Sequence, residues 1–390
     1  MKIIFSISAM LLCHGMVAQS YKHIHDKAIL LDTHNDFLMR AADIGSVMDE
    51  DRTGKDHSDL ARWKKGGLDV QLFSVYTDGD KKEAYSYANR QMDSLDAVVA
   101  RNPDKIEKVY SYKELRKVVK RHKIAAMFGV EGGHMIENDL TKLDALYKRG
   151  TRYLTLTHNI APGWATSAAD ETNTKIVLQH KGLTDFGRQV VQRMNELGML
   201  VDVSHAGDQT FWDVIAATNK PIIASHSSVY ALVPSRRNLK DEQIKAIAKN
   251  GGVIQVNFNP GFIDSSFGKK EDAFLASHST ELDALKKTGM EEFYAVDYIY
   301  HTYAADVQSI RPPLSKLIDH IEYIIHLVGV DYVGLGSDFD GINVTPLQLD
   351  DVTGYPFITK ALVEKGYSKK DINKILGGNF LRVLKANEKK

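Results

Sequence analysis

The apolar positions of the chain gather in short runs rich in β-branched residues, and longer amphipathic stretches separate these runs. The runs are continuous, with no polar residue at every second position, which is typical of parallel strands buried on both faces. We expect strands at residues 28–32, 70–76, 125–130, 153–157, 200–204, 221–225, 253–257 and 332–336.

The stretches between the runs carry helix signals. Four helices have clear signals at their ends. One begins at a capping box at 111–114, and a second covers 183–197 and ends at Gly198. A third runs from 241 to the glycine pair at 251–252, and the last begins at a box at 368–371 and continues through 384. Eight strands that alternate with helices predict an α/β fold, a closed parallel (β/α)8 TIM barrel. An open doubly wound sheet is the alternative. No Gly-x-Gly-x-x-Gly follows any of the runs, which disfavours a dinucleotide site.

Residues that bind metals or transfer protons follow six of the eight runs. Active sites of parallel barrels lie where the strands end, so these side chains are expected to meet. Each of them alone has a plain structural explanation, such as a buried histidine or a turn aspartate. The candidates are His34, Asp36, Glu131, His158, His205, His226 and Asp338.

These candidates divide into two ligand sets. His34 and Asp36 stand two apart and would hold one ion, while His205 and His226 would hold another. Glu131 could give one carboxylate oxygen to each ion. Imidazole beside carboxylate favours zinc or a similar first-row metal. Two ions roughly 3.5–4 Å apart can share a hydroxide that is nucleophilic at neutral pH, which is hydrolytic chemistry.

Three further residues complete the predicted site. Asp338 would accept the proton of the attacking water and return it to the leaving group, and His158 could stabilise charge on the attacked carbonyl oxygen. The loop after the sixth run carries the pair Arg236 and Arg237. One of these arginines could hold an anionic end of the substrate, and a solvated surface pair is the alternative.

Length and charge narrow the class of protein. The 390 residues suit one large barrel domain, 19–390, with a long insertion at about 259–331 that is either a lid or dimer contact or a surface decoration. Lys plus Arg and Asp plus Glu both number 50, so the net charge is zero and nucleic acid is not an expected partner. We expect a small-molecule substrate.

The first eighteen residues have the layout of a signal peptide. Lys2 precedes an apolar run, and small residues near Ala18 suit cleavage. Cys13 is the only cysteine, and Leu12 before it disfavours a lipoprotein signal. We expect an exported protein, periplasmic or secreted, without disulfides. No other stretch approaches the ~18 apolar residues of a membrane span, so no stable membrane anchor is expected.

The candidate residues stand in motifs that resemble those of the membrane (renal) dipeptidase family. The order and spacing cover nearly the whole mature chain. The motifs are Asp32-Thr33-His34-Asn35-Asp36, Gly129-Val130-Glu131-Gly132-Gly133-His134, Leu156-Thr157-His158-Asn159, Val201-Asp202-Val203-Ser204-His205, Ser225-His226-Ser227-Ser228, Ser235-Arg236-Arg237-Asn238 and Gly336-Ser337-Asp338-Phe339-Asp340-Gly341.

The resemblance implies a metallo-dipeptidase on a barrel of the metallo-dependent hydrolase type. It implies two Zn²⁺ per chain, one held by His34, Asp36 and Glu131 and the other by Glu131, His205 and His226. It also implies substrate contacts from His158, Arg237 and Asp338. The implied reaction is hydrolysis of dipeptides, with tolerance for a D-residue at the C-terminal position, and the implied assembly is a homodimer.

The chain also departs from the animal members of that family, which are disulfide-linked and lipid-anchored. After removal of the signal the chain would lack cysteine, and its last residues, 386–390, are polar, so a soluble exported form of bacterial type is expected. Asn259 stands where the animal enzymes have an aromatic residue, and the segment after it differs from theirs. We therefore expect a different side-chain pocket.

Two other functions remain open at this point. A different binuclear amidohydrolase, such as a deacylase or a phosphotriesterase-like enzyme, could use the same barrel. Those that bridge their metals with a modified lysine would need Lys where this chain has Glu131. A non-catalytic exported metal-binding protein would need the metal ligands but not Asp338, His158 and Arg237 together.

Overall fold

The computed structural model describes residues 21–389, so the predicted signal peptide lies outside the described residues. Its centre is a parallel sheet of nine strands in the order β1-β2-β4-β5-β6-β7-β8-β9, with β3 paired to β4. The eight predicted strands are all present, with ends shifted by a few residues. The strands are β1 Leu30–Asp32, β2 Leu68–Tyr76, β3 Ile106–Lys108, β4 Ile124–Glu131, β5 Thr151–Thr155, β6 Leu200–Asp202, β7 Ile223–Ala224, β8 Val253–Val256 and β9 Val333–Leu335.

The first and last strands close the ring. The amide of Thr33 donates to the carbonyl of Leu335 at 3.3 Å, and the amide of Asp338 donates to the carbonyl of His34 at 3.1 Å. A bridge pairs Asn35 with Phe339 just beyond the strands. The eight strands β1, β2 and β4–β9 thus form a parallel barrel, which confirms the predicted (β/α)8 fold and excludes the open doubly wound sheet.

Helices surround the barrel, and most of their bounds match the sequence signals. The single last helix predicted from the box at 368–371 through 384 is wrong, because Gly377 has a non-helical φ of 175° and ψ of −23° and lies between two separate helices, 369–373 and 379–387. Ser111 caps the helix after it, and another predicted helix ends at Gly198, which has a positive φ of 81°. No helix within residues 21–389 is long and apolar enough to cross a membrane. The helices around the barrel are α2 Phe37–Ile44, α3 Leu60–Lys65, α4 Ala84–Arg101, α5 Tyr112–Lys120, α6 Leu140–Arg149, α7 Ala168–Thr172, α8 Asp185–Leu197, α9 Asp208–Ala217, α10 Asp241–Asn250, α16 Leu314–Val328, α17 Tyr355–Glu364, α18 Lys369–Asn373 and α19 Asn379–Asn387.

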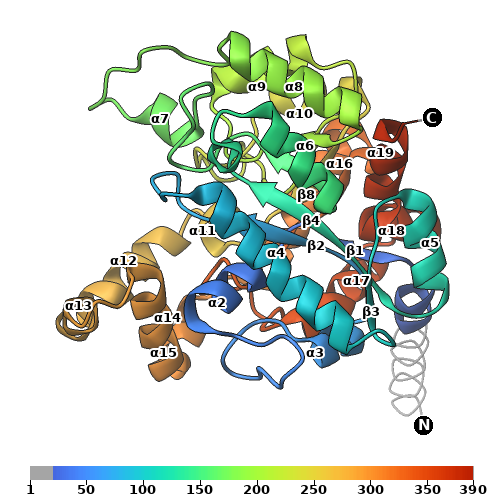
Figure 1. Ribbon diagram of the computed structural model, residues 1–390. Helices are drawn as coiled ribbons and strands as arrows, with labels where there is room; N and C mark the ends of the chain where they lie inside the picture. Colours follow the sequence, from blue (N-terminus) through green and yellow to red (C-terminus); the bar gives the residue numbers. More distant parts are fainter. Residues whose placement is uncertain (1–20, 390) are drawn as a thin grey trace.

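The amino ends of the strands are plugged by α5 and α19. Leu115 of α5 and Phe380 of α19 are buried in one cluster with inward side chains of the strands, among them Val70 and Met127. The two helices lie together on the side of the molecule opposite the insertion (Figure 1). This plug leaves the carboxyl ends of the strands as the accessible end of the barrel.

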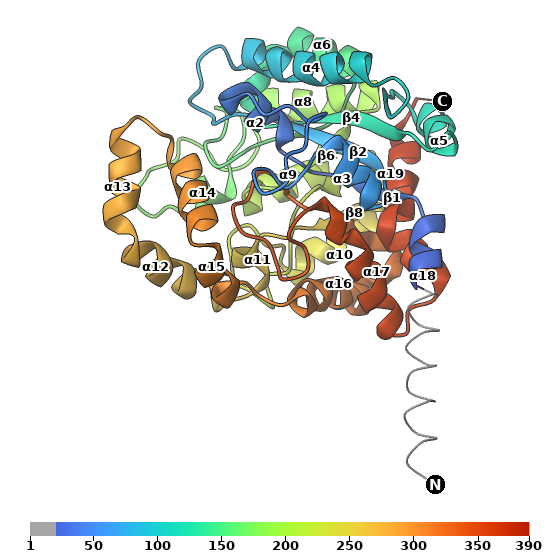
Figure 2. The ribbon, with the colours of Figure 1, turned by 90° about the horizontal axis from the view of Figure 1, so that it is seen from below.

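Between β8 and β9 the chain forms a separate arm of short helices. We call residues 260–310 the insertion arm; it consists of α11 Pro260–Ile263, α12 Phe267–Ser277, α13 Ser279–Lys287, α14 Glu292–Thr302 and α15 Ala304–Ile310. The arm has its own small core, in which Phe274 and Tyr300 stack with ring centroids 5.4 Å apart. Helices α12–α15 lie together at one edge of the molecule in both views (Figures 1 and 2). Helix α16, which follows, packs on α10 and α17 as a helix of the barrel.

One glycine makes room inside the barrel for a large aromatic side chain. Gly129 of β4 pairs with Tyr153 of β5, and a Cβ atom at Gly129 would lie 1.9 Å from the Tyr153 ring. The ring is fully buried, and its hydroxyl donates to the carbonyl of Thr33 at 2.9 Å. The ring therefore has a fixed place and cannot yield to a methyl group.

We predict that Gly129→Ala lowers the free energy of unfolding by about 1–3 kcal/mol, the usual cost of overpacking a core. Denaturant unfolding measures this change. The matched control is Gly268→Ala in α12, where nothing lies within 4 Å of the added Cβ and no loss is expected. If Gly129→Ala is as stable as the wild type, the ring does not need this space.

Candidate metal centre

The carboxyl ends of the strands bring all seven candidate residues of the sequence motifs to one region. His34 and Asp36 follow β1 by two and four residues, and Glu131 is the last residue of β4. The other four stand two or three residues beyond β5, β6, β7 and β9. Three overlapping groups of possible ligand atoms result. They are His34 with Glu131 and His226, Glu131 with His158 and His205, and His34 with Asp36 and Asp338.

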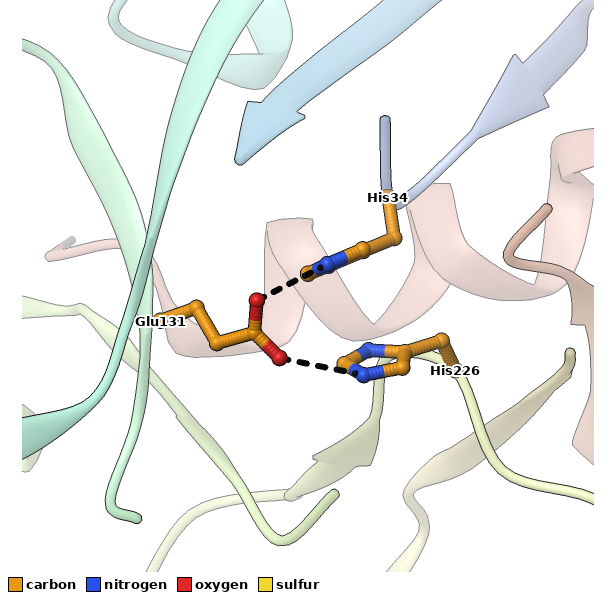
Figure 3. Close-up of side chains that lie close together, drawn as sticks. All are labelled: His34, Glu131 and His226. Atoms are coloured by element: carbon orange, nitrogen blue, oxygen red, sulfur yellow. Dashed lines mark ion pairs between the residues drawn. The ribbon is translucent and has the colours of Figure 1, made fainter. Parts of the chain in front are cut away.

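Glu131 lies at the centre, with each carboxylate oxygen turned toward a different set of ligands (Figure 3). Its Oε2 lies 3.2 Å from Nε2 of His34. Its Oε1 lies 3.2 Å from Nε2 of His226 and 3.1 Å from Nε2 of His205. The two oxygens of Glu131 thus face the two sets of ligands that the sequence analysis names.

Asp36 completes the first set. Its Oδ2 lies 3.4 Å from Nε2 of His34, and the residue directly precedes α2. Gly341 passes so close that a Cβ atom there would lie 2.2 Å from Asp36 Oδ2. The absence of a side chain at Gly341 thus leaves the space that the Asp36 carboxylate occupies.

The histidine of the first set is oriented by Tyr153. Nδ1 of His34 lies 2.8 Å from the Tyr153 hydroxyl, and that hydroxyl donates its own proton to the carbonyl of Thr33. Nδ1 must therefore be the donor toward Tyr153, which leaves Nε2 of His34 for a proton or a metal ion. This nitrogen is the one that faces Glu131 and Asp36. Burial by itself lowers the pKa of His34, but Tyr153, Glu131 and Asp36 raise that pKa well above its usual value.

The histidine of the second set is oriented in the same way. Nδ1 of His226 lies 2.7 Å from Oγ of Ser225, whose hydroxyl donates to Asp202 at 2.5 Å. The buried Asp202 also accepts the backbone amides of Ser204 and Ser225. A hydroxyl held by a carboxylate thus fixes the ring, and Nε2 of His226 is left free toward Glu131.

These residues fit a divalent metal. Nε2 of His34 and Oδ1 of Asp36 are buried and make no hydrogen bond among the described residues. A lone pair that faces carboxylates at 3.2–3.4 Å is repelled unless a cation or a proton lies between them. Imidazole nitrogens with carboxylate oxygens suit zinc and similar first-row ions.

The charges of the centre shift the pKa values of its members. Burial by itself raises the pKa of Glu131, but the imidazoles around it lower that pKa well below its usual value. Burial lowers the pKa of His205 and His226 well below the ordinary range, so both rings are neutral and able to bind a metal. Burial raises the pKa of Asp338 to about 7, and Asp36 acts in the same direction.

Two residues of the centre have strained backbones. His205 and Asp338 have φ angles of 64° and 65°, in the left-handed region that residues with a side chain seldom adopt. Such strain gathers at functional sites, where it directs a side chain that a relaxed turn would point elsewhere. Both positions are directly beyond barrel strands.

A cavity of about 800 Å³ opens above the metal centre. Asp36, Glu131, His205 and Asp338 form its floor, and Arg237 lies in its wall. Arg237 is only 6% exposed, and its Nη2 donates to the carbonyl of His226 at 3.2 Å. Its Nε and Nη1 have no partner among the described residues. Burial lowers the pKa of this guanidinium to about 10, so it is still charged at neutral pH.

His158 lies beside the second set of ligands. Its ring centroid is 4.4 Å from that of His205, and burial lowers its pKa. The hydroxyl of Tyr76 lies 3.3 Å from Nδ1 of His158 and donates to Asp78 at 2.6 Å. Tyr76 therefore positions a histidine of the site.

The sequence motifs did not assign roles to several residues that support the site. Tyr76, Tyr153 and Ser225 orient the histidines, and Asn257 donates to Oδ2 of Asp338 at 2.9 Å. Asp32 accepts from the Ser337 amide and from the hydroxyls of Ser337 and Tyr355. The sequence does contain a signal for Asp32 and Asp202. Asp32 stands two residues before His34, and Asp202 stands three residues before His205.

Barrel, ligand sets and cavity together define a metal-dependent hydrolase of the TIM-barrel type. The family model described as membrane dipeptidase (Peptidase family M19) matches residues 18–390. The chain belongs to this family, which confirms the resemblance seen in the motifs, and it is a metallo-dipeptidase.

Individual relatives agree with this assignment. The uncharacterised dipeptidase C965.12 of Schizosaccharomyces pombe is 32% identical over 395 residues, which cover 96% of this chain and 84% of the relative. The crystal structure of the probable dipeptidase PvdM from Pseudomonas aeruginosa matches with a TM-score of 0.78 and 26% identity, over 95% of this chain and 98% of that one. A metallopeptidase from Rhodobacter sphaeroides, solved with a phosphinate mimic of the dipeptide L-Ala-D-Ala, shares the fold with a TM-score of 0.75 and 22% identity, over 93% and 100% of the two chains.

Proposed function

We propose that the chain cleaves the peptide bond of dipeptides with a free C-terminal carboxylate, with two zinc ions held by the two sets of ligands that share Glu131. The observation that carries the substrate assignment is Arg237. A buried guanidinium with two unpaired nitrogens is costly, and a carboxylate is the group that satisfies both in a fork. The arginine lies in the wall of the cavity whose floor is the metal centre.

His34 and Asp36 would hold one ion, His205 and His226 the other, and Glu131 both. When bound, the two ions would supply Lewis acidity toward water and toward the scissile carbonyl. Neighbouring side chains orient the ligands themselves. The Tyr153 and Ser225 hydroxyls keep the rings of His34 and His226 with Nε2 turned toward the centre.

Asp338 is placed to transfer the proton. Its Oδ1 lies 3.9 Å from Nε2 of His34, and Asn257 holds its other oxygen. As the water oxygen bonds to the carbonyl carbon, the carboxylate takes one proton from the water. It returns that proton to the amine nitrogen as the C–N bond breaks.

His158 is placed to stabilise the developing charge. It lies beside His205 and lines the cavity. Its Nδ1 faces the Tyr76 hydroxyl, so a neutral ring would donate from Nε2 only with that hydroxyl turned from Asp78 to donate to Nδ1. A hydrogen bond to the carbonyl oxygen would strengthen as that oxygen becomes negative. The Tyr76 hydroxyl lies at the Nδ1 edge of the imidazole.

Three further expectations from the motifs belong to the same proposal. They are tolerance for a D-residue at the C-terminal position, export to the periplasm or outside after cleavage of the signal, and assembly as a homodimer. A panel of L,L and L,D dipeptides tests the first. Fractionation of cells and light scattering of the purified protein test the others.

The metal assignment predicts about two divalent ions per chain, measured by elemental analysis after loading with zinc. Glu131→Gln should weaken both sites together, because one carboxylate serves both ions. Glu137→Gln, a change of an acidic residue of the same type outside the cavity, is the matched control and should keep both ions. Loss of a single ion in Glu131→Gln would show that Glu131 does not bridge.

For Asp338→Asn we expect the fold and the metal content to persist while kcat falls on the order of 10²-fold or more, the usual size for a positioned acid or base. Steady-state kinetics on one L,L dipeptide measure the change. Circular dichroism and elemental analysis of the same sample serve as controls. Unchanged turnover would remove Asp338 from proton transfer.

The role of Arg237 predicts that a dipeptide amide is a much poorer substrate than the free dipeptide, and that tripeptides fail because their carboxylate lies out of reach. Arg237→Ala should erase most of the preference for acid over amide, chiefly through kcat/KM, and leave the metal content alone. Arg236→Ala is the matched control for charge. A wild type that cleaves acid and amide equally well would place substrate recognition elsewhere.

A further inference from the structure

The cavity above the metal centre has two ends of opposite charge. Arg236 and Arg237, which follow β7, lie in its wall. The remaining rim carries four carboxylates and one ammonium group outside the metal centre, from Asp43, Asp78, Asp80, Glu291 and Lys81. We call these five residues the acidic rim.

The order of the strands places the two ends on opposite sides of the barrel. In the ring β1-β2-β4-β5-β6-β7-β8-β9, β2 and β7 are four places apart, which is half of the circle. Asp78 and Asp80 directly follow β2, and Arg237 lies on the loop after β7. A substrate whose carboxylate binds Arg237 therefore directs its other end toward the acidic rim.

The rim also lies at a definite depth from the metal centre. Asp43 comes seven residues after Asp36, two turns along the same face of α2, which is roughly 10 Å farther out. One extended residue spans only about 3.3–3.6 Å, so the α-amino group of a dipeptide at the metal centre does not reach Asp43. A long side chain on the N-terminal residue does.

Aromatic side chains complete this wall. The hydroxyls of Tyr87 and Tyr294 both donate to Asp43, the second at 3.1 Å. The ammonium group of Lys81 and the guanidinium of Arg90 lie 4.2 and 5.0 Å from the centroid of the Tyr87 ring. A cation is thus already accommodated on an aromatic face beside a carboxylate, which is the environment that favours ammonium and guanidinium groups.

We propose that the acidic rim, with Tyr87 and Tyr294, is a subsite for a cationic side chain on the N-terminal residue, so that lysyl and arginyl dipeptides are preferred. This inference rests on the proposed function, because Arg237 sets the direction of the substrate. That arginine is buried, unpartnered on two nitrogens and part of the same cavity wall. The insertion arm supplies Glu291 at its α14 end together with Tyr294, so the arm is a determinant of specificity.

The test compares Lys-Ala with norleucyl-Ala, which has the same four-carbon stem without the ammonium group. We expect kcat/KM of the zinc-loaded wild type to be about tenfold higher for Lys-Ala at low salt, and the ratio to fall as the ionic strength rises. The double variant Asp43→Asn with Glu291→Gln should lower the ratio at least about threefold. Lys81→Met should raise it about twofold, because the competing cation is gone.

The double variant Asp283→Asn with Glu364→Gln is the matched control, since both side chains are exposed, do not line the cavity, and together change the net charge equally. It should leave the ratio unchanged. A wild-type ratio near one, or an unchanged ratio in the double variant of Asp43 and Glu291, overturns the proposal while dipeptide hydrolysis stands.

Binding of uncleaved phosphinate analogues of the two dipeptides, measured by calorimetry, gives the same comparison without turnover. The lysyl analogue should bind about tenfold more tightly to the wild type and lose that advantage in the double variant of Asp43 and Glu291. If neither dipeptide is cleaved, the proposed function fails, and the calorimetric ratio still decides the subsite. Equal affinities for the two analogues overturn the proposal.

Discussion

The structure of the site depends on one carboxylate, that of Glu131, which offers an oxygen to each of two sets of ligands. The carboxylate is buried with three imidazoles within 3.2 Å, an arrangement that a low-dielectric interior tolerates only when charge is balanced. Metal ions between these groups would supply that balance, and each imidazole would bind them with its inward lone pair. Much of the surrounding polar structure, from the Tyr153 hydroxyl to the pair Ser225 and Asp202, serves that orientation.

The barrel and the residues at its strand ends could be predicted from the sequence because both signals are local. A buried parallel strand is a continuous apolar run, and the residue after it lies at the open end of the barrel whatever the helices outside do. His34, Glu131 and His205 were found in this way. The three-residue strand β3 was not found, because Ile106–Lys108 contains a single apolar residue and gains its place from pairing with β4.

The supporting contacts could not be predicted, because they join residues that are far apart in the chain. Asp32 accepts hydrogen bonds from Ser337 and Tyr355, about three hundred positions later, and Gly129 matters only because Tyr153 lies opposite. No periodicity or spacing encodes such pairs. The place of the insertion arm at the rim of the cavity is of the same kind, since the helical pattern of 279–287 says nothing about where that helix lies.

The arm is also tied to the metal centre through a single helix. Arg40 of α2 donates to Asp56 at 2.6 Å and to Asp297 of α14 at 2.7 Å, all three groups being buried. The same short helix begins directly after Asp36 and carries Asp43 near its other end. A shift of the arm would therefore move α2, and with it Asp36, the proposed metal ligand that directly precedes this helix. A substitution in the arm would therefore affect both the proposed side-chain subsite and the position of Asp36. Substrate preference and the geometry of the metal centre would then change together.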